Sequence, residues 1–315
     1  MPSNLCVAFR QHSVSYYSTA ATGAVNSHPP YKTLLLEAPV PHVLHVRLNR
    51  PDKRNAITAQ AFRELRECFE RTDQCSHTRA VVLSGEGTVF SAGLDFQDIS
   101  TLINAGTDWV GLCGQASGAP VDIARRAKGI RKVLKQWQNS LTTIAECSKP
   151  VVAAVNGPCI GGGLEVAIAC DIRYCSCDSY FSIREVTLGM AADVGSLQRV
   201  PKIMGNDSLV RELAFTGRNL NATDALAHGL VSKVLPTGAE AVESALELAK
   251  VIAANSPLAV QGSKAGLNFS RDHTVRVGLE FMAAWNQCMI QSDDLIKAAM
   301  ATTTRTTEPP VFDDL

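Results

Sequence analysis

The sequence predicts an α/β protein, because strand-like and helix-like patterns alternate along most of its 315 residues. Val151–Val155 is apolar at every position, which is typical of a strand covered by helices on both faces of its sheet. Just before it, residues 123–147 place apolar side chains three and four positions apart, as a one-sided helix does. After about residue 238 only helical spacing remains, so we expect helices appended to an α/β core.

The other elements follow in chain order from the same kinds of pattern. Val43–Leu48 alternates apolar and polar side chains in part, which predicts a strand, and Ala80–Gly85 is a second short strand that ends in glycine. Between them, Thr58 can cap a helix whose apolar side chains recur at helical spacing as far as Phe69. A further strand is expected at Asp171–Cys175. The helices expected after the core are Ala241–Ala254, Ala259–Asn268 and Val275–Cys288.

The composition argues against several classes of protein. Thirty basic and thirty acidic residues cancel, so no overall field favours nucleic acid or an anionic membrane as a partner. The longest apolar runs are far too short to span a bilayer. The ten cysteines are scattered along a chain large enough to fold without disulfides, so we expect them to be reduced. No ligand cluster suggests a metal, and no cofactor is expected.

The first 36 residues differ from the rest of the chain, because they contain no acidic residue and many hydroxyl-bearing ones. An acid-free, hydroxyl-rich leader over residues 1–35 is typical of an organellar transit peptide, and a disordered leader is the alternative. The last residues, Phe312–Leu315, do not form the peroxisomal address, so a mitochondrial location is favoured over a peroxisomal one. The expected division is therefore a leader over 1–35, a core over 36–237 and a helical region over 238–315.

Two glycine-containing loops offer backbone N–H groups to a ligand. Gly161–Gly163 follows a strand and opens a helix, where the first amides have no partner and an anion is favoured. Ser91–Asp95 is a second loop that follows a strand. Two such loops can aim two N–H groups at one oxygen, the arrangement that stabilises an enolate. The alternative for the glycines is a packing turn.

Three acidic residues are candidates for proton transfer. Glu165 lies in the first turn after the glycines, and Glu185 and Asp193 are eight positions apart. Asp193 has small or apolar neighbours, so desolvation is expected to raise its pKa toward the range useful for acid–base chemistry. The alternatives are that Glu165 complements a helix dipole and that Asp193 caps the helix before Leu197.

Four linked segments closely resemble the enoyl-CoA hydratase/isomerase (crotonase) family. They are Leu48–Ala56 (LNRPDKRNA), Phe90–Asp95 (FSAGLD), Asn156–Glu165 (NGPCIGGGLE) and Cys170–Arg173 (CDIR). The resemblance extends from about residue 36 to residue 300. It implies a crotonase-like spiral of ββα units, with C-terminal helices that trimerise. It also implies an acyl-CoA thioester substrate, a homotrimer or homohexamer, and an oxyanion hole formed by the backbone N–H groups of Leu94 and Gly162. CoA is part of the substrate, so the resemblance adds no cofactor.

Within that resemblance, the acids select the reaction. Asp193 stands where hydratases of the family usually have glycine and Δ3,5-Δ2,4-dienoyl-CoA isomerases have aspartate. The implied reaction converts 3,5-dienoyl-CoA to 2,4-dienoyl-CoA in the β-oxidation of unsaturated fatty acids, with Glu185 near carbon 2, Asp193 near carbon 6 and Glu165 as an auxiliary acid. Glu165 departs from those isomerases, which typically have aspartate there. The alternatives are an enoyl-CoA hydratase that uses the Glu165/Glu185 pair, and a noncatalytic acyl-CoA-binding or RNA-binding relative.

Substrate contacts outside the acyl group are also implied by the resemblance. Lys53, Arg54 and Ala56 follow the first strand, where the family binds the nucleotide, and Lys297 could reach its 3′-phosphate, even in a neighbouring subunit. Solvated surface charge is the alternative for these residues. The RNA-binding alternative depends on basic residues of the helix that begins at Ile123. We expect these residues to form a solvated face of the helix. Neither nucleic acid nor a membrane is expected as a partner. These basic residues are Arg125, Arg126, Lys128, Arg131, Lys132 and Lys135.

Overall fold

The computed structural model describes residues 19–98, 122–304 and 309–315. Its largest element is a six-stranded sheet with the strand order β1-β2-β3-β4-β6-β9. The first two strands pair antiparallel and every other neighbouring pair in this sheet is parallel. The strands are β1 (Leu34–Val40), β2 (Val43–Leu48), β3 (Ala80–Gly85), β4 (Val151–Val155), β6 (Ile172–Ser176) and β9 (Lys233–Leu235).

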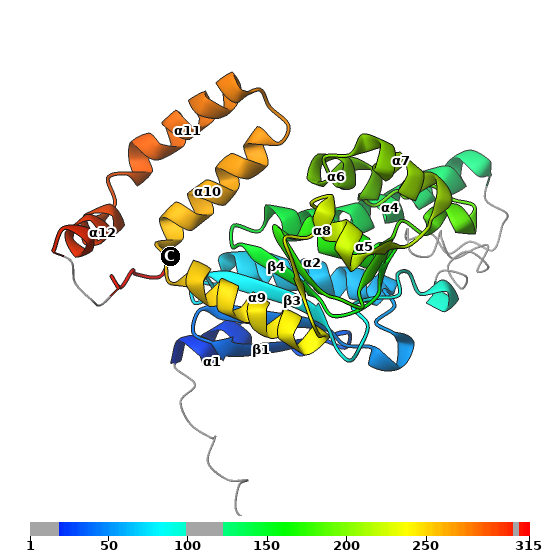
Figure 1. Ribbon diagram of the computed structural model, residues 1–315, viewed down its shortest axis with the longest axis horizontal. Helices are drawn as coiled ribbons and strands as arrows, with labels where there is room; N and C mark the ends of the chain where they lie inside the picture. The colour runs from blue at the N-terminus through cyan, green and yellow to red at the C-terminus, as the bar shows by residue number, and fades with distance from the viewer. Residues whose placement is uncertain (1–18, 99–121, 305–308) are drawn as a thin grey trace, which may run out of the picture.

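Helices cover both faces of this sheet, as the uniformly apolar strands predict (Figure 1). On one face, α2 (Ala59–Gln74) and α4 (Ile123–Glu146) pack into the main core, in which the Phe62 and Trp137 rings stack 5.2 Å apart. On the other face, the alanines of α9 (Gly238–Ala253) pack against valines of β2, β3 and β4. The predicted N-cap is confirmed, since the Thr58 side chain accepts a hydrogen bond from the Ala61 amide.

A second, three-stranded sheet and several short helices lie beside the first sheet. Its order is β5-β7-β8, with β5 parallel and β8 antiparallel to the central strand. The strands are β5 (Cys159–Ile160), β7 (Tyr180–Ser182) and β8 (Leu220–Asn221). The helices are α5 (Gly162–Ala169), the 3-10 helix η2 (Glu185–Leu188), α6 (Ser196–Ile203), α7 (Asp207–Thr216) and α8 (Ala222–Ala227). Every residue of α5 is buried, so the helix that opens with the glycines is a core element.

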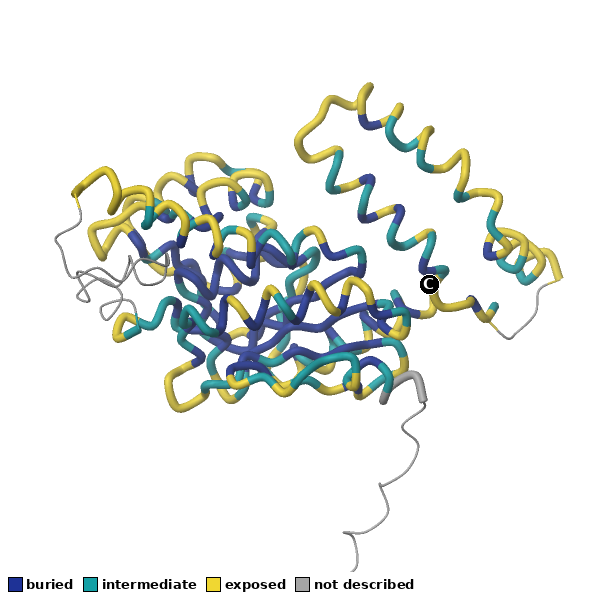
Figure 2. Tube along the Cα trace, turned by 180° about the vertical axis from the view of Figure 1, so that it is seen from behind, coloured by how far each residue is buried: buried dark blue, intermediate teal, exposed yellow. Residues whose placement is uncertain are grey.

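The C-terminal helices extend away from the core (Figures 1 and 2). They are α10 (Pro257–Ser270), α11 (Val275–Met289) and α12 (Asp293–Thr304), which confirms the predicted helical region. The first two form a hairpin, in which the Phe269 and Phe281 rings stack 4.2 Å apart. Large apolar side chains remain exposed on these helices, including Leu267 at 73% and Leu279 at 66%.

The structure describes the chain from residue 19, before the expected core boundary at residue 36. Helix α1 (Thr19–Asn26) packs against β1 and β2, with Ala24 fully buried. Glu64 of α2 then accepts hydrogen bonds from the Lys32 and Thr33 amides, which fixes the chain before β1. The part of the expected leader that the structure describes, residues 19–35, thus packs against the core. Residues 1–18 lie outside the described residues, and the transit peptide stays a prediction.

Candidate active site

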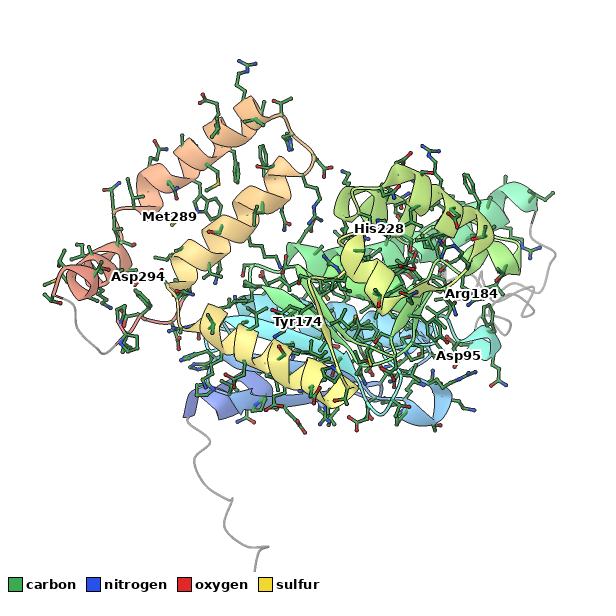
Figure 3. All side chains as sticks on the ribbon, viewed as in Figure 1. Asp95, Tyr174, Arg184, His228, Met289 and Asp294 are labelled. Atoms are coloured by element: carbon green, nitrogen blue, oxygen red, sulfur yellow. The ribbon has the colours of Figure 1, made fainter. Side chains whose placement is uncertain are left out.

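The two glycine-containing loops predicted from the sequence lie against each other. The loop that follows β3 pairs with β5 through Ser91, whose amide donates to the Pro158 carbonyl while its own carbonyl accepts from the Ile160 amide. Figure 3 labels Asp95, which follows Leu94, and Arg184, which precedes Glu185, at the same end of the molecule. The candidate site is therefore built where the loops after the strands meet, the usual place for a site in an α/β fold.

The Leu94 and Gly162 amides are close neighbours. A Cβ atom placed on Gly162 would lie 3.6 Å from the Leu94 nitrogen, and one placed on Gly93 would lie 3.6 Å from the Gly162 nitrogen. Among the described residues, neither of these two N–H groups donates to a carbonyl or a side chain. Gly162 is also the first residue of α5, where the helix dipole favours negative charge. The arrangement can hold one oxygen that becomes anionic during a reaction.

Each of the three glycines has a different local role. Gly161 has φ 49° and ψ −119°, a conformation that glycine adopts readily, and its amide donates to the Ser182 carbonyl. A Cβ atom on Gly163 would lie 2.6 Å from the Ser91 Cβ atom, so this glycine permits close packing of α5 on the first loop. The packing-turn alternative therefore describes Gly163, while Gly162 carries one of the two neighbouring amides.

Glu165 is a fully buried acid whose two carboxylate oxygens differ. The backbone amide and the hydroxyl of Ser196 donate to its Oε1 atom over 3.4 and 3.3 Å, while its Oε2 atom has no hydrogen-bond partner among the described residues. Burial first, and then the charges of Glu185 and Asp193, raise the pKa of Glu165 to about 8. At neutral pH this group is therefore mostly uncharged, which does not fit a role as the anionic partner of a helix dipole.

Glu185 and Asp193 complete an electrostatically coupled group of three acids. Glu185 is 5% exposed, and its Oε1 atom would lie 3.0 Å from a Cβ atom placed on Gly161. Its Oε2 atom finds no hydrogen-bond partner in the part of the chain that the structure describes. Burial, and then the charge of Asp193, raise the pKa of Glu185, and burial raises the pKa of Asp193. Asp193 does not cap α6, because the N-cap residue of this helix is Gly195 and no side-chain cap hydrogen bond forms there.

Side chains that the sequence patterns did not single out hold the segment that carries Asp193. The Gln138 side-chain amide of α4 donates to the Asp193 carbonyl over 2.7 Å. The Arg199 guanidinium of α6 donates to the Val194 carbonyl over 3.4 Å. Gln138 belongs to no motif, whereas Ser196 and Arg199 lie in the segment Ala191–Arg199, which resembles the dienoyl-CoA isomerases of the family but gave neither residue a role.

A polar cavity of about 450 Å³ adjoins Asp193 but not the other two acids. It lies between α4, α6 and the end of α10, and Glu146, Arg199 and Arg271 are among its lining residues. Within the described ranges, no group of three or more metal-ligating side chains occurs. In that same part of the chain, no helix combines the length and the apolar character needed to cross a membrane.

Three of the four residues predicted to contact CoA lie beside the first loop. Lys53 and Arg54 are exposed, and Arg54 and Asn55 have the positive φ values of 50° and 52°. The Ala92 amide donates to the Arg54 carbonyl, and the Ala56 carbonyl accepts a hydrogen bond from Arg50.

The fourth residue, Lys297, lies elsewhere. It is on α12, where it forms an ion pair with Asp313 over 2.7 Å. Figure 1 shows α12 at the opposite end of the molecule from α5. The chain by itself therefore does not bring Lys297 to the glycine loops.

Comparison with known proteins identifies the family. The enoyl-CoA hydratase/isomerase family profile matches residues 41–110 and 116–308. The chain belongs to this family. A human protein named Delta(3,5)-Delta(2,4)-dienoyl-CoA isomerase, mitochondrial, is 45% identical over 286 residues, which is 91% of this chain and 83% of the relative. An Arabidopsis thaliana protein, named as the peroxisomal form of that isomerase, is 39% identical over 82% of this chain and 89% of its own.

The fold class is confirmed by solved structures of the same family. The crystal structure of an enoyl-CoA hydratase from Bacillus anthracis superposes with a TM-score of 0.77 and 25% identity, over 90% of this chain and 99% of that one. The crotonase resemblance of the four motifs is therefore confirmed as well.

Proposed function

We propose that this protein converts 3,5-dienoyl-CoA thioesters into 2,4-dienoyl-CoA thioesters. The reaction removes a proton from carbon 2 and returns one to carbon 6, through a dienolate whose charge rests largely on the thioester oxygen. The observation that carries the proposal is the third acid: Asp193 is electrostatically coupled to Glu165 and Glu185 and has a raised pKa. Relatives of 45% and 39% identity that are named as this isomerase support it.

The oxyanion is assigned to the adjacent Leu94 and Gly162 amides. Both N–H groups are fixed before the reaction, because their loops pair with each other and α5 is fully buried. Preorganised donors of this kind each lower the barrier by about 3 kcal/mol. The substrate carbonyl would be placed within reach of both N–H groups.

The two ends of the dienolate are assigned to different acids. We place Glu185 at carbon 2, because its Oε1 atom lies close to Gly161, next to the oxyanion amides. Asp193 then serves carbon 6, farther along the acyl chain. Burial of the acids favours neutral carboxyls and excludes water, so one can accept a proton while another donates. Only a proton moves, so the proposed chemistry needs no cofactor.

An enoyl-CoA hydratase remains the second candidate. The observation that favours it is the pair Glu165 and Glu185, since each has a buried carboxylate oxygen without a partner that could orient a water molecule. A paired assay on one preparation separates the two functions. Isomerisation of a 3,5-dienoyl-CoA should exceed hydration of a 2-enoyl-CoA, and the reverse would transfer the assignment to the hydratase.

Self-association and a mitochondrial location complete the proposal. The apolar side chains exposed on α10, α11 and α12 support a homotrimer or homohexamer, because a monomer gains nothing from leaving them in water. Sedimentation at several protein concentrations tests this. The name of the human relative supports the mitochondrion, while the Arabidopsis relative is named as peroxisomal. Imaging of the tagged full chain distinguishes the two compartments.

A further inference from the structure

Glu165 is connected to each of the other two acids through its immediate surroundings. On one side, its amide donates to the Gly161 carbonyl over 3.0 Å, and the Cα atom of Gly161 faces the Glu185 carboxylate. On the other side, its Oε1 atom accepts two hydrogen bonds from Ser196, three positions after Asp193. Glu165 is thus held between the segment that carries Glu185 and the segment that carries Asp193.

The free oxygens of the site are unusual for buried groups. Nearly all buried polar atoms in folded proteins have a hydrogen-bond partner. The Oε2 atoms of Glu165 and Glu185 are buried and have none in the described structure. A carboxyl group that keeps its proton has both a donor and an acceptor, so it can take up one proton and release another. Burial favours this neutral form of Glu165.

The proposed isomerisation leaves the site with its protons in the wrong places. After one turnover, Glu185 has gained the proton from carbon 2 and Asp193 has lost a proton to carbon 6. Before the next turnover, Glu185 must lose a proton and Asp193 must gain one. Glu185 is 5% exposed and does not line the polar cavity beside Asp193, so direct exchange of its proton with bulk water is hindered.

We infer that Glu165 returns this proton from Glu185 to Asp193 after each turnover. The inference rests on the proposed function. The unpartnered Oε2 atom of neutral Glu165 accepts the proton of Glu185, and a proton held on its Oε1 atom, which lies beside Ser196, passes to the Asp193 carboxylate. One O–H bond forms and one breaks at Glu165, so this side chain ends the step neutral, as it began. Glu165 is a relay between acids and does not touch the substrate.

Glu165→Gln tests the relay, because glutamine has nearly the same size and is neutral but cannot relay a proton in this way. In a rapid-mixing experiment, its first turnover should match that of the unaltered protein, since Asp193 already holds its proton. Later turnovers should then slow by at least about tenfold, giving a burst of one product per subunit. Glu165→Asp should restore linear product formation. Glu146→Gln makes the same change at an exposed position of the neighbouring cavity and should give no burst.

Isotope labelling gives a second measurement that a structural role of Glu165 would not change. In D2O, the unaltered protein should place part of the hydrogen from carbon 2 on carbon 6, and Glu165→Gln should place deuterium there. Three results would overturn the relay: linear kinetics in Glu165→Gln at the unaltered rate, a first turnover slowed as much as the later ones, or complete deuteration at carbon 6 by the unaltered protein. Failure of the unaltered protein to form any 2,4-dienoyl-CoA refutes the proposed function instead.

Discussion

Replacing Glu165 by glutamine should stabilise the protein by an amount that grows with pH. The pKa of Glu165 is raised from 4.5 to about 8 in the folded protein. Between these values the unfolded chain carries a carboxylate while the folded protein keeps the proton, so unfolding releases a proton and becomes easier as pH rises. The stability that the protonated carboxyl contributes is complete below its ordinary pKa and is lost as pH rises through the folded value. Glutamine has no proton to lose.

The size of the effect follows from the shift in pKa. Each pKa unit corresponds to about 1.4 kcal/mol, so the advantage of Glu165→Gln should grow by about that amount per pH unit and reach roughly 5 kcal/mol above the folded pKa. Urea unfolding of both proteins, at the same protein concentration and at several pH values from about 5 to about 8.5, measures the difference. Effects of titrating groups that do not interact with Glu165 cancel in that difference.

Glu64→Gln provides the matched control. Glu64 is also buried, and burial alone would raise its pKa, but hydrogen bonds from Thr33, Gln60 and the Lys32 amide outweigh burial and lower the pKa of Glu64. This residue is therefore ionised in both states throughout the pH range tested. Its replacement should destabilise the protein by a nearly constant amount. If the difference in unfolding free energy between Glu165→Gln and the unaltered protein also stays constant with pH, the reasoning about Glu165 is refuted.

Three further predictions concern the reaction. Asp193→Asn should lower the turnover of 3,5-dienoyl-CoA by about 10²-fold or more while acyl-CoA binding survives, and near-normal steady-state rates would end the assignment of Asp193 as an acid. Gly161→Ala should cost about 1–3 kcal/mol of stability, because alanine adopts the Gly161 backbone conformation poorly. It should also lower kcat, because the new methyl group would lie 3.0 Å from the Glu185 carboxylate. An unchanged kcat together with an unchanged thermal midpoint would contradict this. Hydration of crotonyl-CoA by the unaltered protein should be minor. It should rise in Asp193→Gly, which introduces the residue usual in hydratases. The ratio of hydrated to isomerised product, measured by chromatography for both proteins, tests this, and an unchanged ratio would contradict it.

Local chemistry predicted much of the site. The amides at the start of α5 follow from the strand β4, a glycine turn and a helix, which are all visible in the sequence. The helix over residues 123–147 follows from its apolar spacing, and Ile123–Glu146 confirms it. These features depend on neighbours a few positions apart, so the pattern is enough.

Features that depend on distant contacts could not be predicted in this way. Ser196 donates to Glu165 across 31 positions of the chain, and nothing in either segment indicates that they meet. Whether Asp193 caps a helix or lines a site depends on where α6 begins, and Gly195 rather than the aspartate takes the cap. The position of Lys297 depends on how α12 packs, which its own pattern does not specify. The two-residue strand β5 is too short to give a recognisable pattern.

The hydrogen bonds between residues 50–57 and the Leu94 loop have a consequence for how substrate size affects catalysis. The Ala92 amide is bonded to the Arg54 carbonyl, the Ile57 amide to the Gly93 carbonyl, and the Ser91 hydroxyl to the Asn55 carbonyl. A nucleotide bound at the proposed Lys53–Ala56 surface would therefore be held on the same rigid unit as the Leu94 amide and would position the thioester against it. Attraction for a distant adenosine would then speed the chemical step itself, and thioesters shortened to the pantetheine portion should react more slowly even at saturating concentration.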